Sequence, residues 1–145
     1  MSGKKLIKSP EIIAEIASTH NGSKIILEKI VSKLIKDKIK IVKFQIFNNK
    51  FLCHSSSKYY SGLKRIEISQ KDWKKIINKY KKRIRIILEP FDEQSYSFCK
   101  QFRKHVFIKI SSSENDNFNI IFDILKNFKK VFFNISGKSE NEIFN

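Results

Sequence analysis

Two lysines interrupt apolar stretches of this chain in which buried β-strands are expected. Lys43 lies in the segment VKFQIF and Lys109 in the segment VFIKI. A charge in a buried strand is costly unless it is paired or meets an anionic ligand, and a phosphate or carboxylate would offset that cost. The pattern therefore predicts a site for a phosphorylated acid. Two alternatives stay open: the lysines reach outward to water, or they pair with Glu15 or Glu89.

Glu15 and Gln45 add groups suited to a hydroxylated substrate. Glu15 lies at the end of the apolar run IIAEIA, where a carboxylate could orient a substrate hydroxyl or accept a proton. Gln45 follows Lys43 by two positions, so both side chains are expected on one side of a strand, where the amide could bind a sugar. The alternate positions are apolar: Val42, Phe44 and Ile46. That apolar side is expected to pack under helices, which turns Lys43 and Gln45 inward.

Hydroxyl and backbone donors follow two later apolar runs. Ser111 and Ser112 come after the fourth run, and Ser136 and Gly137 come after the fifth. Such groups bind phosphate at strand ends. Each serine taken alone is equally explained by a cap or a turn.

The three histidines show no metal-binding spacing, and no residue is assigned to a metal. The chain contains no HExxH motif, no Gly-rich phosphate loop and no nucleophile elbow. His54 and His105 are interpreted as structural. His20 is kept as a substrate-binding candidate because it follows the first strand.

Parallel strands are needed to bring these residues together. Five segments have an apolar, β-rich run with a polar end: AEIASTHNG, VKFQIF, ILEPFDE, IKISSSEN and FFNISG. This is the layout of a (β/α) barrel, whose chemistry lies at the carboxyl ends of the strands. Strands are predicted over residues 12–17, 39–47, 84–88, 106–110 and 131–135. Since a full barrel needs about 250 residues, the fold class is α/β, a partial TIM-type barrel of about the first five βα units.

Helical periodicity predicts helices over residues 24–37, 70–82 and 93–103, and a further helix from Ile120 to Phe128. The polar segment 48–68 is predicted to be a lid or binding loop, with disorder as the open alternative. The 145 residues are long enough for one domain, 1–145.

A formal net charge of +16 admits a nucleic acid, an anionic membrane or an acidic small molecule as partner. Most of the cations are lysines, and the sequence pattern spreads them over helix faces, whereas nucleic-acid surfaces more often show clustered arginines. We interpret them as solvated lysines and do not expect a nucleic-acid partner. Cys53 and Cys99 have no partner motif, and no signal peptide or membrane span is found, so a cytoplasmic protein is expected.

The ordered motifs IIAEIxxxHNGS, VKFQ, EPFDExS, KISSSExN and SG resemble the amino-terminal barrel of the sialic acid synthase family, from about Ile12 to Gly137. The resemblance implies condensation of phosphoenolpyruvate with N-acetylmannosamine or a related N-acetylated hexosamine, giving a nine-carbon 2-keto acid. It also implies assistance by Mn²⁺ or Mg²⁺. By position, Lys43, Lys109 and Ser112 match the phosphoenolpyruvate contacts, and Glu15 and Gln45 match residues that hold the sugar.

The chain also departs from that family. Glu89 stands where a small hydroxyl residue is common, and its carboxylate would repel a phosphate unless a lysine or metal offsets it. The second half of the barrel, which holds the family's metal-binding histidines, and the small antifreeze-like carboxy-terminal domain are expected to be absent. The resemblance therefore implies a truncated or split synthase that is inactive alone, acting with a complementing chain or as a homodimer. The alternative is a non-catalytic relic, or a basic module that binds nucleic acid or another anion.

Overall fold

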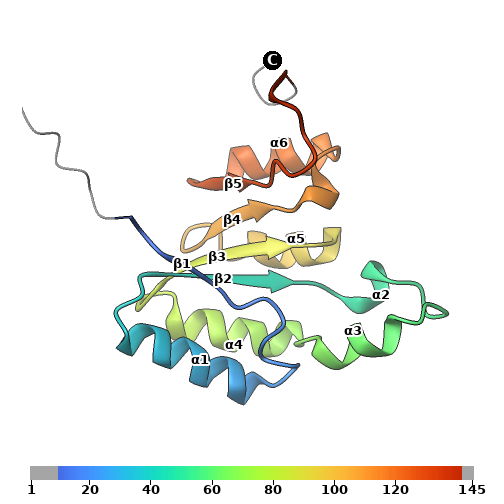
Figure 1. Cartoon of the computed structure of the whole chain (residues 1–145). Coiled ribbons are helices and arrows are strands. Elements are labelled where there is room, and N and C mark those ends of the chain that lie inside the picture. Colours follow the sequence, from blue (N-terminus) through green and yellow to red (C-terminus); the bar gives the residue numbers. More distant parts are fainter. Residues whose placement is uncertain (1–9, 142–145) are drawn as a thin grey trace, which may run out of the picture.

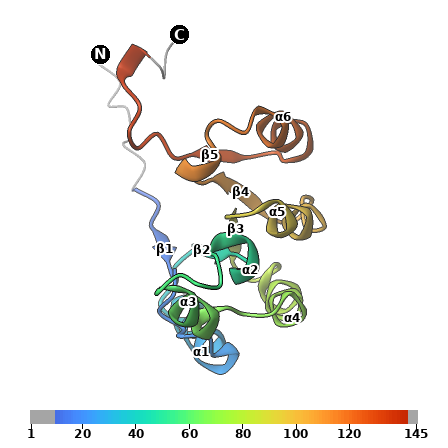
Figure 2. The same cartoon turned by 90° about the vertical axis from the view of Figure 1, so that its right-hand side faces the viewer.

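The computed structural model describes residues 10–141, which form a single parallel sheet with helices on one side. The strands follow chain order, from β1 to β5. Their bounds are β1 Ile13–Glu15, β2 Ile41–Ile46, β3 Arg85–Pro90, β4 Phe107–Ile110 and β5 Val131–Phe133. Figure 2 shows the strands as a curved row whose convex side carries the helices. This is the predicted half of a (β/α) barrel, and β1 and β5 come out shorter than the sequence suggested.

At least one helix connects each strand to the next, and α2, α3 and α4 all lie between β2 and β3 (Figure 1). Their bounds are α1 Lys24–Lys36, α2 Asn49–Leu52, α3 Tyr60–Ile66, α4 Gln70–Tyr80, α5 Glu93–Lys100, the short 3₁₀ helix η1 Ser112–Glu114, and α6 Phe118–Asn127. The segment 48–68 thus contains two short helices, α2 and α3. The helix predicted over 93–103 ends earlier, at Lys100.

Side-chain caps fix where several helices begin. The Ser23 hydroxyl accepts the Ile26 N–H at the start of α1, and the Ser69 hydroxyl accepts the Asp72 N–H at the start of α4. These caps satisfy backbone donors that have no partner inside the helix. The turn residues 17–22, with positive φ at Ala17, Asn21 and Gly22, lead the chain from β1 to α1 on the convex side of the sheet.

The core lies between the sheet and the helices. Alternate residues of β2 to β4 point into it: Val42, Phe44, Ile46, Ile86, Leu88, Ile108 and Ile110, all nearly or fully buried. Trp73, Ile76, Ile77 and Tyr80 of α4 cover them from the helix side. The intervening residues of each strand must face the concave side, because side chains alternate along a strand. No helix within residues 10–141 has the length and apolar character required to cross a membrane.

Candidate functional site

The candidate site lies on the concave side of the sheet, toward the carboxyl ends of the strands. Strand register sets Glu15 beside Lys43, and Gln45 beside Glu89. Leu88 pairs with Ile108, which places Glu89 and Lys109 next to each other on neighbouring strands. Four strands therefore each contribute one charged side chain to the same small area.

These four side chains form a continuous chain of ion pairs, called here the charge cluster: Glu15, Lys43, Glu89 and Lys109. The Lys43 ammonium contacts both Glu15 and Glu89. The Lys109 Nζ lies 2.7 Å from the other carboxylate oxygen of Glu89. With two carboxylates and two ammonium groups, the cluster has no formal net charge.

Burial decides how strongly the members of the cluster depend on one another. Glu89 and Lys43 are 2% and 7% exposed, whereas the Glu15 side chain is 41% exposed. Burial lowers the pKa of Lys43, although the hydrogen bond to Glu89 opposes that shift. Burial alone would raise the pKa of Glu89, but hydrogen bonds from Lys109 and Lys43 outweigh it and hold the pKa below its ordinary value. Glu89 is therefore an anion at neutral pH.

Of the two alternatives left open by the sequence, the structure shows the second: the lysines pair with carboxylates and do not reach outward to water. Lys43 and Lys109 point inward and bind Glu15 and Glu89. This pairing explains how two cations are accommodated on a buried sheet face, and it leaves their role toward a ligand as a prediction.

Glu15 is held at the end of its strand by its own backbone. Its Oε1 accepts the Ala17 N–H at 2.9 Å, and Ala17 has a positive φ of 46°. Gln45 is half-buried beside Glu89 on the same side of the sheet. Glu15 is therefore the exposed end of the charge cluster, and Gln45 lies beside the cluster.

The three candidate serines lie in the loops after β4 and β5. Ser111 is buried and its hydroxyl hydrogen-bonds to that of Ser113. Ser112 opens η1 and is exposed. Ser136 is exposed, and its backbone N–H binds the Asn134 side chain at 3.0 Å. Their part in phosphate binding stays a prediction.

His20 has structural partners of its own. It is 2% exposed, its Nδ1 accepts the Gly22 N–H at 3.0 Å, and its ring meets the edge of Trp73 at a centroid distance of 6.0 Å. Burial lowers the pKa of His20. These contacts account for its burial without a substrate.

Glu89 is the residue that the site prediction undervalued. The sequence marked it as a departure that would repel a ligand, yet it is the member that joins the two lysines. Glu89 could have been found from its position in the strand. Side chains alternate along β3, and Glu89 points to the same side of the sheet as its neighbours Gln45 and Lys109.

The charge cluster does not suit a divalent cation. Within residues 10–141, no group of three or more His, Cys, Asp or Glu side chains is arranged to hold a metal ion. The nearby carboxylates of Glu15 and Glu89 are already bound by Lys43, whose positive charge opposes a second cation. The metal expected from the family resemblance therefore has no ligand set in this part of the chain.

Two solved structures share this fold. One is an N-acetylneuraminic acid (sialic acid) synthetase from Leptospira borgpetersenii serovar Hardjo-bovis in complex with citrate, with 21% identity and a TM-score of 0.79 over 92% of this chain and 47% of that protein. The other is a putative spore coat polysaccharide biosynthesis protein E from Chromobacterium violaceum, with 20% identity and a TM-score of 0.76 over 93% of this chain and 44% of that protein. The chain thus spans less than half of each of these proteins.

Sequence comparison assigns the family. A search of curated proteins finds no significant match. The model of the NeuB family matches residues 30–144, which is most of the chain and includes Lys43, Glu89 and Lys109. This match agrees with the order of the strand-end motifs and with the half-barrel. The chain belongs to the NeuB family, whose members are related to sialic acid synthases.

Proposed function

We propose that this chain forms the phosphoenolpyruvate-binding half of a nonulosonic acid synthase site. The observation that carries the proposal is the pair of inward lysines, Lys43 and Lys109, which flank one buried carboxylate at the carboxyl end of a parallel sheet. Family membership supports the reaction class, and the position of the cluster fits the usual site of chemistry in (β/α) barrels.

The proposed reaction joins phosphoenolpyruvate to an N-acetylated hexosamine. The C3 carbon of the enol bonds to the aldehyde carbon of the sugar, whose oxygen takes up a proton. Water adds to C2, and the C2–O bond to phosphate is lost, which leaves a 2-keto acid and inorganic phosphate. Lys43 and Lys109 would neutralise the phosphate and carboxylate groups, so that the electron-rich enol carbon can approach the carbonyl. Glu15 and Gln45 would orient the sugar hydroxyls.

Glu89 already occupies the two lysines that would bind the substrate. Since the cluster is already neutral, an anionic substrate must compete with Glu89 for the two lysines. We therefore expect phosphoenolpyruvate to bind weakly, with a dissociation constant near the millimolar range.

The rest of the site would come from outside these five βα units. We propose that the remaining strands and the metal ligands lie outside the described residues, since the charge cluster offers neither. We therefore expect no turnover by the purified 145-residue chain. Keto-acid synthesis by that chain alone would refute this expectation.

Calorimetric titration of phosphoenolpyruvate into the full chain tests the proposal. We expect binding that is lost when Lys43→Met and Lys109→Met are combined, because methionine keeps the side-chain volume without the charge. A matched control, Lys29→Met with Lys71→Met, removes two exposed lysines from α1 and α4 and should leave binding unchanged. Circular dichroism confirms that each variant is folded.

The relic alternative makes the opposite forecast. No binding at about 10 mM phosphoenolpyruvate, or equal binding by the cluster variant and the control variant, would overturn the proposed site. The family assignment would then describe ancestry and fold only.

A further inference from the structure

A run of basic residues stands at the start of each of the strands β2 to β5, just before the strand or reaching into its first residue. The runs are Lys36, Lys38 and Lys40; Lys81, Lys82, Arg83 and Arg85; Arg103, Lys104 and His105; and Lys129 and Lys130. Because the strands are parallel and adjacent, their starts lie along one edge of the sheet. Charges that are spread along the sequence therefore gather where the strands start, whereas the charge cluster lies toward the strand ends. We call this surface the basic rim.

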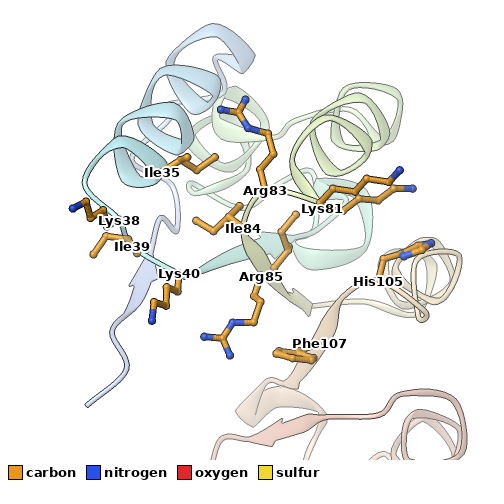
Figure 3. A pocket seen from close by; sticks show the side chains of 12 residues that line it. Ile35, Lys38, Ile39, Lys40, Lys81, Arg83, Ile84, Arg85, His105 and Phe107 are labelled. Carbon is orange, nitrogen blue, oxygen red and sulfur yellow. The ribbon is translucent and has the colours of Figure 1, made fainter. Parts of the chain in front are cut away.

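The basic rim contains a pocket of about 500 Å³. Its floor is apolar and consists of Ile35, Ile39, Ile84, Ile86 and Phe107. Its walls carry Lys38, Lys40, Lys81, Lys82, Arg83, Arg85 and His105, and among residues 10–141 no carboxylate lines it. Figure 3 shows basic side chains from the starts of β2, β3 and β4 arranged around Ile84. Binding pockets for small ligands fall in this range of volume.

Within residues 10–141, few carboxylates lie close enough to the basic rim to balance its positive charge. Glu11 pairs with Arg85, and it also interacts with Lys130 and Lys40, so one carboxylate faces cations from the starts of three strands. Asp37, the other nearby carboxylate, lies 2.7 Å from Lys33 of α1. The basic rim is therefore a field of excess positive charge, which attracts polyanions.

Aromatic rings lie beside the cations. Phe107, in the pocket floor, lies 6.4 Å from Phe132 on the neighbouring strand, and the Lys130 ammonium is 5.5 Å from each ring centroid. Both rings are half-buried and so are partly accessible. Cations that follow a line, with aromatic faces between them, are the features by which proteins bind single strands without sequence preference.

We propose that the basic rim binds single-stranded nucleic acid, with phosphates on the strand-start lysines and arginines and a base against Phe107. The row of cations continues past the pocket to Lys129 and Lys130, which favours a chain of phosphates over one small anion. Lysine acts as a point charge on phosphate and reads no base pattern, so binding is independent of sequence. The concave pocket gives a membrane surface no flat apolar face to enter.

Fluorescence anisotropy with a labelled 12-nucleotide single strand of mixed sequence tests this proposal on the full chain. We expect the affinity to fall with rising salt, because each phosphate contact releases counterions. The rim variant Lys40→Gln, Lys82→Gln and Lys130→Gln should bind about tenfold more weakly and show a shallower salt dependence, by up to about 0.7 in slope per lost contact. Phe107→Leu should weaken binding by about fivefold and leave the salt slope unchanged.

The matched control is Lys29→Gln, Lys71→Gln and Lys75→Gln, on the exposed faces of α1 and α4. It lowers the net charge of +16 by the same three units, and its affinity should stay within about twofold of the parent chain, as the salt slope should. Equal losses in the rim and control variants would show attraction by net charge alone and overturn the proposal.

Two further measurements test whether the pocket binds free nucleotides instead, and whether the nucleic acid binds at the charge cluster instead. Binding of ATP or inorganic triphosphate at micromolar concentration, with no binding of the 12-nucleotide strand, would assign the pocket to free nucleotides and overturn the nucleic-acid assignment. The combined Lys43→Met and Lys109→Met variant should bind the strand normally, because neither lysine belongs to the basic rim or lines its pocket. Loss of binding in that variant would place the nucleic-acid site at the charge cluster and overturn the basic-rim assignment.

Discussion

Glu89 binds Lys109 across neighbouring strands, with 2.7 Å between the Oε1 oxygen and the Nζ nitrogen. The other oxygen of the same carboxylate binds Lys43, so one buried anion pairs with two cations, and Glu15 supplies the second negative charge. This arrangement makes the charge cluster both a structural feature of the sheet and the place where an anionic ligand would have to enter.

Loss of Lys43 should destabilise the fold strongly. Lys43→Ala removes a buried cation from Glu89 and leaves a cavity, and we expect the free energy of unfolding to fall by about 3 kcal/mol. Lys43→Met should cost about half as much, because it fills the same space. Urea denaturation measures both. The exposed pair of Lys33 with Asp37 provides the comparison, since Lys33→Ala should cost less than about 1 kcal/mol. Similar losses at the two lysines would contradict a role for burial.

Replacing Glu89 should strengthen binding of phosphoenolpyruvate. Glu89→Ser frees both lysines from their internal counterion, and we expect affinity to rise at least tenfold, or about 1.4 kcal/mol. Calorimetry of the variant against the parent chain measures the change. Asp116→Ser removes one exposed carboxylate and should have no effect. Weaker binding after Glu89→Ser would mean that Glu89 supports the ligand instead of competing with it.

Gly22 should tolerate no larger residue. Its φ is +73°, and a Cβ atom there would lie 2.1 Å from the Arg65 carbonyl oxygen. We expect Gly22→Ala to lower stability by at least about 2 kcal/mol, from the positive φ and the backbone clash together. Gly62 is the matched control, because a Cβ at that helical position meets nothing within 4 Å. Gly62→Ala should stabilise the protein or leave it unchanged in thermal unfolding.

Acidification should destabilise the protein in a range set by His20. Because burial lowers the pKa of His20, the unfolded chain takes up its proton first, and stability is lost as pH falls from about 6.5 toward the lower folded pKa. A second loss should begin below about pH 4.3, where Glu89, with its lowered pKa, is protonated first in the unfolded chain. Urea denaturation between pH 7.5 and 3.5 measures both.

A substitution at His20 tests whether this residue causes the loss of stability that begins near pH 6.5. His20→Asn retains an acceptor for the Gly22 N–H and does not titrate, so the change in stability between pH 7.5 and 5.5 should become small. An unchanged pH profile in that variant would assign the loss to other groups.

The sheet edges should promote self-association of the 145-residue chain. β1 and β5 end the described sheet, and Ile13 and Phe133 on them are 41% and 47% exposed. Unpaired strands with apolar residues recruit further strands. We expect sedimentation velocity to show concentration-dependent dimers or larger species, and Ile13→Lys with Phe133→Lys to reduce them. Ile25→Lys, at an exposed position of α1, should not. A parent chain that stays monomeric at high concentration would refute this prediction.

Local patterns were sufficient to predict much of the fold. The alternation of Lys43 and Gln45 with apolar neighbours predicted which side of β2 faces the helices, and the structure confirms it. The helix predicted to begin at residue 70 is confirmed as well, since α4 starts at Gln70, where the Ser69 hydroxyl accepts the Asp72 N–H. These features depend on residues close in sequence, whose geometry is set by the strand period and by the first turn of a helix.

The same information could not predict the pairing within the site. Glu89 and Lys43 are 46 positions apart, and only the parallel register shows that their carboxylate and ammonium groups meet. The basic runs looked like scattered solvated lysines until the sheet brought the starts of β2 to β5 to one edge. The sequence by itself therefore determined the strands, their inward faces and the family. The tertiary structure alone decided which charges neutralise each other and which remain in excess, because electrostatic energy depends on distance in space and on burial, not on separation along the chain.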